Sequence, residues 1–226
     1  MVRAKLTEAD HAMVTAAVAR AEAGTDGEIV TIVANQSDSY HDVALHYALA
    51  GMLLVIALVG LNPGGVEERL GWFSNGWERQ PNPANLVFAI LIVETVTFLV
   101  IRYALAWTPL RLALTPKATR ARRVRRRAVQ YFKVGAERRT QARVGIMLFL
   151  SLDEHIAEIV ADEAIHKVVP PERWGDAMAA LVDKVRVGQP GEGMAAAVAA
   201  IGAIVAEHFP KTEGDRNELP DRLIEL

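Results

Sequence analysis

The sequence predicts an α/β protein in which a small αβα sandwich, a sheet between helices, is interrupted by a two-helix transmembrane hairpin. Three runs of strand length lie among helical patterns, which predicts the sandwich. Two apolar runs of 19 and 22 residues predict the hairpin. The 226-residue chain is 51% hydrophobic, which excludes a disordered protein. It has no cysteine, which excludes disulfides, thiolate metal sites and a cysteine nucleophile.

The segment ahead of the hairpin is predicted to form one helix and one strand. Thr7 and Asp10 have the spacing of a capping box that starts a helix, and we expect Gly24 to end it in the left-handed conformation. The run Glu28–Ala34 (EIVTIVA) is short and rich in β-branched residues, so it predicts a strand. A polar link over 35–42 then leads into the first apolar run.

The two apolar runs have the length and composition of membrane spans. Residues 43–61 carry no formal charge and would cover roughly 28 Å as a helix, close to the ~30 Å hydrocarbon core. Residues 86–107 carry only Glu94 and Arg102. Two buried helices of a soluble core are the alternative, disfavoured by the length of the first run. Glu94 either has a function in the membrane or, as we prefer, hydrogen-bonds the first span in its neutral form while Arg102 reaches the headgroups.

Charge asymmetry orients the hairpin. The only basic residues of the loop 62–84 are Arg69 and Arg79. In contrast, 12 basic residues and one acidic residue lie from Arg111 to Arg143. The positive-inside rule therefore predicts a multi-pass protein of the cell (inner) membrane with both termini in the cytoplasm. The basic run Arg120–Arg127 has no interleaved aromatic residues, so it predicts contact with anionic headgroups of the lipid bilayer and no nucleic-acid partner.

After the hairpin the pattern returns to a soluble α/β arrangement. A helix is predicted over 116–139, with Ala121, Val124, Ala128 and Tyr131 facing a core. Two strands over 144–152 and 156–161 and two helices starting at Pro170 and Pro190 follow. The helix from Pro190 is not predicted to span, because its uninterrupted apolar stretch is 13 residues long. The predicted parts are therefore 1–42, the hairpin 43–107, and 108–226.

Carboxylates are the candidate reactive groups, because the sequence contains no nucleotide-binding, metalloprotease or serine-hydrolase motif. Glu158 lies within the third predicted strand, Asp162 and Glu163 follow it, and Glu28 starts the first. Such groups could supply acid and base, or hold a divalent cation and a phosphate. A plain helix cap is the alternative for Asp162, and the one that we prefer.

Several segments resemble the TPM-domain family, which includes thylakoid-lumen acid phosphatases and photosystem-repair factors. They are GEIVTIVA, VGIMLFLSLDEHIAEIVADEAIHKVVP, the helix with Trp174, HFP at 208–210 and the ending NELPDRLIEL, the last as in bacterial membrane members. The resemblance implies a compact αβα sandwich and phosphatase activity linked to a divalent cation. It places Gly145 at the family's strand-opening glycine and Asp162 in the acidic segment. Glu163 and Ala164 stand where a glycine is usual.

Together these observations predict a membrane-anchored interaction or assembly module on the cytoplasmic face, with an unidentified membrane-protein partner. The alternative function is an acid phosphatase. Its catalytic residues would be Asp162 and Glu158, and Asp162, Glu163 and Glu28 would surround a calcium or magnesium ion.

Overall fold

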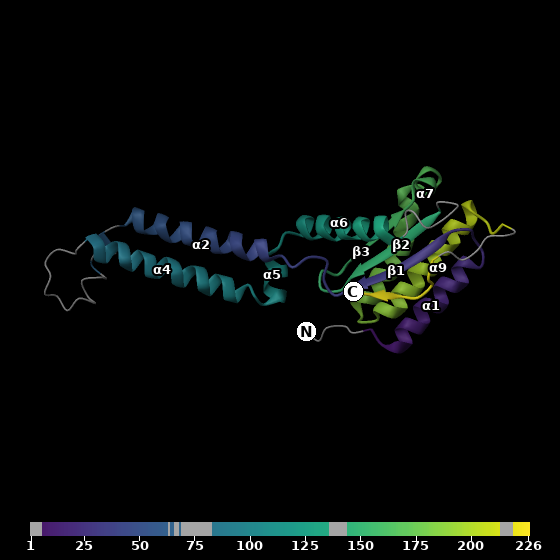
Figure 1. Ribbon diagram of the computed structural model, residues 1–226, viewed down its shortest axis with the longest axis horizontal. Helices are drawn as coiled ribbons and strands as arrows, with labels where there is room; N and C mark the ends of the chain where they lie inside the picture. The colour runs from purple at the N-terminus through teal and green to yellow at the C-terminus, as the bar shows by residue number, and fades with distance from the viewer. Residues whose placement is uncertain (1–5, 63, 66–67, 69–82, 136–143, 213–218) are drawn as a thin grey trace. The chain divides into compact units, whose positions relative to one another are not determined.

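The computed structural model describes residues 6–62, 64–65, 68, 83–135, 144–212 and 219–226 (Figure 1). The chain forms two compact units. The sheet unit comprises Met1–Asp38 and Lys117–Leu226, and the helical unit comprises Ser39–Pro116. The sheet unit is therefore built from two segments that are separated in the sequence by the whole helical unit.

The sheet has four strands in the order β3-β2-β1-β4. β1 (Glu28–Ala34) runs parallel to both β2 (Gly145–Ser151) and β4 (Ile224–Glu225), while β3 (Ile156–Ala161) is antiparallel to β2. The three predicted strands are confirmed, the first and third at the predicted residues. β4 was not predicted, because two residues at the end of the chain carry too little pattern to indicate a strand.

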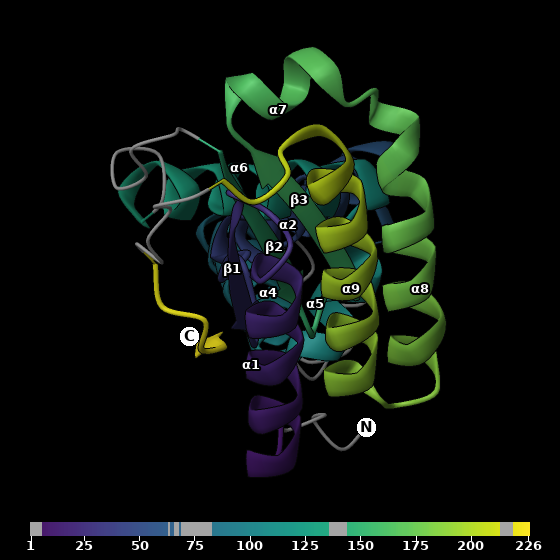
Figure 2. The ribbon, with the colours of Figure 1, turned by 90° about the vertical axis from the view of Figure 1, so that its right-hand side faces the viewer.

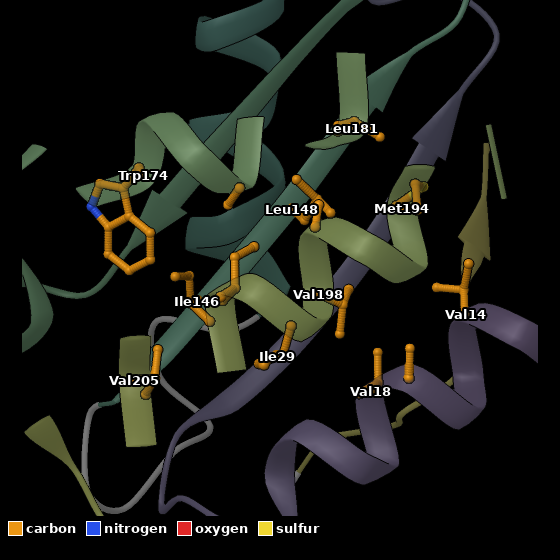
Figure 3. Close-up of a cluster of buried hydrophobic side chains, with 14 of the residues drawn as sticks. Val14, Val18, Ile29, Ile146, Leu148, Trp174, Leu181, Met194, Val198 and Val205 are labelled. Atoms are coloured by element: carbon orange, nitrogen blue, oxygen red, sulfur yellow. The ribbon is translucent and has the colours of Figure 1, made fainter. Parts of the chain in front are cut away.

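Three helices cover one face of the sheet: α1 (Glu8–Glu22), α8 (Trp174–Arg186) and α9 (Pro190–His208), which lie side by side in Figure 2. Their apolar side chains interdigitate with those of β1 and β2 to form the larger core (Figure 3). Fully buried members of this core are Val14, Val18, Ile146, Leu148, Leu181, Met194, Val198, Ile201 and Val205. α9 is long and apolar enough to cross a membrane, but this packing places its apolar stripe inside the sheet unit.

α6 (Lys117–Gly135) covers the opposite face of the sheet. Val124, Ala128 and Phe132 are buried against β2, where Tyr131 also meets the ring of Phe149 with centroids 5.8 Å apart. Ala121 is exposed, contrary to the predicted register. The helix buries positions 124, 128 and 132, so its stripe begins one turn later than the sequence pattern indicated.

The start of α1 is confirmed and its predicted end is wrong. Thr7 accepts a hydrogen bond from the Asp10 amide at 3.2 Å, and Asp10 accepts one from the Thr7 amide at 2.8 Å. Gly24 does not adopt a positive φ. The chain instead leaves the helix through Ala23 in a right-handed conformation, and Thr25 donates to the Phe209 carbonyl at 2.5 Å. Among the described glycines, Gly188 after α8 has the left-handed conformation, with φ 80°.

The remaining elements of the sheet unit are short. α7 (Glu163–Val168) follows β3, and the 3-10 helix η1 (Pro171–Arg173) leads into α8. The two prolines at 170 and 171 therefore start a single turn of 3-10 helix before the α-helix that the sequence predicted there.

The helical unit contains α2 (His41–Leu61), α4 (Pro83–Ala104) and the short α5 (Thr108–Leu114). α2 and α4 pack as an antiparallel pair, with Gly51 of α2 against Thr97 and Ile101 of α4. The apolar side chains that face away from this contact are solvent-accessible. Both helices are long and apolar enough to cross a membrane, as the sequence predicted. Tyr47 donates to the Leu114 carbonyl at 3.0 Å, so α5 is tied back onto α2.

Candidate carboxylate site

Two candidate carboxylates lie at one end of the sheet. Glu28 at the start of β1 is in register with Gly145 at the start of β2, and Asp162 follows the last residue of β3 on the other side of Gly145. The three residues share the face of the sheet that α6 covers, because they alternate with residues of the opposite core. Two strand spacings separate Glu28 from Asp162, about 10 Å between their Cα atoms.

Asp162 binds the first residue of β2 and does not cap the following helix with its side chain. Its Oδ2 accepts a hydrogen bond from the Gly145 amide at 2.8 Å, and its own amide donates to the Gly145 carbonyl at 2.9 Å. Asp162 occupies the N-cap position of α7 without a side-chain cap bond. The preferred prediction of a helix cap is therefore confirmed for the position of Asp162 and wrong for its side-chain bond. The Asp162 side chain is buried, with 8% exposure.

The other two candidates lie apart from this pair. Glu158 is four residues back along β3, about 13 Å from Asp162. It contacts Arg125 of α6 at 3.3 Å, and burial raises the pKa of its carboxyl. Glu163 is exposed and paired with Lys167 at 2.9 Å, which lowers the pKa of Glu163. The structure thus brings Glu28 and Asp162 to one sheet end and leaves Glu158 and Glu163 elsewhere. No group of three metal-ligating side chains occurs among the described residues.

Glu22 is a buried carboxyl at the same end of the sheet that the sequence analysis missed. Its Oε1 accepts a hydrogen bond from the Ile29 amide at 2.7 Å, which ties the end of α1 to the start of β1. Its Oε2 is buried and has no hydrogen-bond partner among the residues described. Burial, with smaller contributions from the nearby carboxylates of Glu28 and Asp221, raises the pKa of Glu22 to about 8. Glu22 is therefore largely neutral at neutral pH.

Another buried carboxylate, Glu154, lies at the opposite end of the sheet. It lies in the β2–β3 turn with 3% exposure. Its Oε1 accepts hydrogen bonds from the amide and hydroxyl of Ser37, and its Oε2 accepts one from the Ser151 hydroxyl at 2.5 Å. Glu154 thus fixes the segment that follows β1 to the end of β2.

Arginines of α6 hold the same segment. Asp38 contacts Arg123 at 3.2 Å and Arg126 at 3.4 Å, and Arg127 donates to the Ser37 carbonyl at 2.9 Å. The side chain of Arg123 is 14% exposed, whereas that of Arg126 is 65% exposed. The basic run Arg120–Arg127 is therefore divided between contacts with the protein and an outward face.

Little in the sequence pattern indicates a role for Glu22, Asp38 or Glu154. Their partners lie between 3 and 117 residues away, so the roles depend on contacts that only the fold creates. The one local signal was the spacing of Ser151 and Glu154, three residues apart across a tight turn, which resembles the side-chain pairing of a capping box.

Glu22 should make the stability of the fold depend on pH. Its folded pKa of about 8 exceeds the ordinary value of 4.5, so its contribution is complete below pH 4.5 and is lost as pH rises to about 8. We expect the free energy of unfolding to fall by about 2–4 kcal/mol over that window. Denaturant titrations of the full chain in detergent measure it. In Glu22→Gln the decrease should be absent, because the amide keeps the bond to Ile29 and cannot ionise.

The control for this experiment is Glu172→Gln, which removes an exposed carboxyl from η1. It should retain the pH dependence of the unmodified chain. Parallel loss of stability in the unmodified chain and Glu22→Gln would contradict the assignment to Glu22.

No protein-family model matches the chain, and no curated protein matches it. Among solved structures, the NMR structure of the BA42 protein from the psychrophilic bacterium Bizionia argentinensis is similar, with a TM-score of 0.56 and 14% sequence identity. The match covers 100% of this chain and 99% of that chain. At this level of identity the likeness concerns the fold alone. The chain is thus an α/β protein with a four-stranded mixed sheet that shares its fold with BA42.

Proposed function

We propose that this chain is a membrane-anchored α/β module that holds a protein partner at the cytoplasmic face of the cell membrane. The observation that carries the proposal is the exposed apolar surface of α2 and α4. Leu53, Leu54, Val87, Phe88 and Val100 are each 57–66% exposed, on helices of 21 and 22 residues. A soluble monomer rarely exposes so large an apolar surface, whereas lipid tails would cover it.

The residues at the C-terminal end of α4 support a membrane boundary at that point. Tyr103 in the last turn of α4 is 72% exposed, and Trp107, three residues after the helix, is 66% exposed. Tyrosine and tryptophan favour the headgroup region, because their rings have an apolar body and a polar edge. This is the end of the hairpin from which the basic segment departs, which fits a cytoplasmic exit.

The outward face of α6 supports contact with anionic lipid. Arg122, Arg126 and Lys133 are exposed, on the side of the helix away from buried Val124, Ala128 and Phe132. Each basic residue near an anionic surface contributes about 1 kcal/mol of attraction. α6 begins 13 residues after α4 ends, so a membrane-anchored chain keeps this face within reach of the headgroups.

The proposal also includes a protein partner and membership of a protein family. Two helices are too few to line a transport path, so the hairpin suits the role of an anchor, and the sheet unit is the part that would bind a partner. The αβα arrangement, the strand GEIVTIVA and Gly145 beside Asp162 support membership of the TPM-domain family, as a bacterial membrane form.

The orientation can be tested with single cysteines, because the chain has no natural cysteine. Ser37 and Ser151 are poor positions, since both are buried and bonded to Glu154. Ala12→Cys and Ala118→Cys place the thiol at exposed positions of α1 and α6, and Ser74→Cys places it between the spans. In intact cells an impermeant maleimide should label position 74 alone, and permeabilised cells should expose the other two. Labelling of positions 12 and 118 in intact cells would reverse the orientation.

The lipid contact of α6 can be tested in nanodiscs that hold the full chain. A fluorophore on Ala118→Cys should be quenched by spin-labelled lipid more strongly in phosphatidylglycerol than in phosphatidylcholine, and high salt should reduce the difference. The double variant Arg122→Gln, Lys133→Gln should weaken this contact by roughly 2 kcal/mol. Arg20→Gln removes an exposed charge from α1 and should leave it unchanged. Equal quenching in both lipids would contradict the proposal.

Phosphomonoester hydrolysis is a second candidate function. It is favoured by the placement of Glu28 and Asp162 on one face at one sheet end, on either side of Gly145. A bound calcium or magnesium ion would offset the charge of the two carboxylates next to a phosphate.

The phosphatase candidate predicts hydrolysis of an aryl phosphate between pH 4 and 8 that depends on calcium or magnesium. Asp162→Asn should lower the rate by roughly 100-fold or more, because it removes a charge and can still accept the bond from Gly145. Glu158→Gln should retain most of the activity, since Glu158 lies about 13 Å from Asp162. Background rates in the unmodified chain, or equal losses in the two variants, would reject this candidate.

A further inference from the structure

We propose that the α2–α4 hairpin contains a proton-binding group, the carboxyl of Glu94, enclosed between the two helices. Glu94 is the twelfth of the 22 residues of α4, which places it near the middle of the helix. It is 6% exposed, on a helix whose other residues are at least partly exposed. Both of its carboxyl oxygens are buried, and neither has a hydrogen-bond partner among the described residues. The predicted hydrogen bond between Glu94 and the first span is therefore not observed.

The surface opposite Glu94 is apolar. Gly51 of α2 lies against Thr97 and Ile101 of α4, and the helices run antiparallel, so the α2 residues that face Glu94 come after Gly51. From Met52 to Leu61 the sequence MLLVIALVGL has no titratable or charged side chain. α2 therefore offers neither a counter-charge nor a side-chain donor at this level.

The other titratable groups on α2 and α4 lie toward the helix ends remote from the loop 62–82, and that loop itself carries Glu67, Glu68, Arg69, Glu78 and Arg79. On α2 they are His41, Asp42, His46 and Tyr47, in the first two turns. On α4 Arg102 and Tyr103 are eight and nine residues from Glu94, about 12 and 14 Å along the helix axis. Thr97 and Arg102 are partly buried and share with Glu94 the side of α4 that faces α2. These polar groups lead from Glu94 toward the end of the hairpin that we assign to the cytoplasm.

The apolar surroundings of the Glu94 carboxyl favour a proton as its ligand. A carboxylate inside the hydrocarbon layer, without counter-ion or donor, is strongly disfavoured relative to the neutral acid. Taking up one proton removes the charge and allows the close packing of α2 on α4. Loss of that proton favours water entry and separation of the helices. This inference rests on the proposed membrane insertion of the hairpin.

Carbodiimide labelling of the full chain in membranes tests the inference. Dicyclohexylcarbodiimide partitions into the bilayer, where a neutral carboxyl transfers its proton to a carbodiimide nitrogen while the carboxyl oxygen bonds to the central carbon. The resulting O-acylisourea rearranges to a stable N-acylurea that peptide mass spectrometry locates. We expect modification at Glu94. Glu94→Gln should lose it, Glu94→Asp should retain it, and a water-soluble carbodiimide should not modify Glu94.

A carbonate wash of the same membranes separates failure of this inference from failure of the proposed function. If the chain stays in the membrane but Glu94 is unmodified, the proton-binding role is wrong and the anchor stands. If carbonate releases the chain, the anchor is wrong, and the intramembrane role of Glu94 falls with it.

Discussion

The parallel pairing of β1 with β2 is the constraint on which the rest of the structure depends. Parallel neighbours cannot be joined by a tight turn, so the chain must cross from one end of the sheet to the other between them. Here 110 residues separate Ala34 from Gly145, and this crossover contains the entire helical unit together with α6. The pair α2 and α4 is thus an elaboration of an obligatory connection, which explains how two long apolar helices can interrupt a sheet without changing its order.

Buried carboxyls serve the two ends of this sheet in different ways. At the end where β1 and β2 begin, Glu22 and Asp162 accept hydrogen bonds from the amides of Ile29 and Gly145. At the other end Glu154 collects donors from Ser37 and Ser151. Backbone amides at the margins of a small sheet lack ladder partners, so side-chain acceptors complete them. Glu22, Asp162 and Glu154 therefore stabilise the ends of the sheet, whatever chemistry occurs at these positions.

Sequence reasoning found the parts of the fold that depend on local pattern. β1 and β3 were predicted at their observed residues because β-branched side chains on a buried strand leave a dense signal. The Thr7–Asp10 cap was found because both partners lie within one turn. The end of α1 was predicted incorrectly, since Gly24 takes its conformation from Thr25 and Phe209, 184 residues apart. In the candidate site, the pairing of Glu28 with Gly145 could not be predicted without the strand register. The roles of Glu22 and Glu154 could not be predicted because their partners are brought close only by the fold.

The hydrogen bonds and ion pairs of Ser37 and Asp38 have a mechanical consequence. These two residues immediately precede the helical unit and are bound to the β2–β3 turn by Glu154 and to α6 by Arg123, Arg126 and Arg127. A pulling force transmitted along the backbone from α2 therefore meets these bonds before it reaches Ala34 and the ladder of β1. Several hydrogen bonds and ion pairs share such a force, so the contacts of Ser37 and Asp38 protect the pairing of β1 from a force applied through the helical unit.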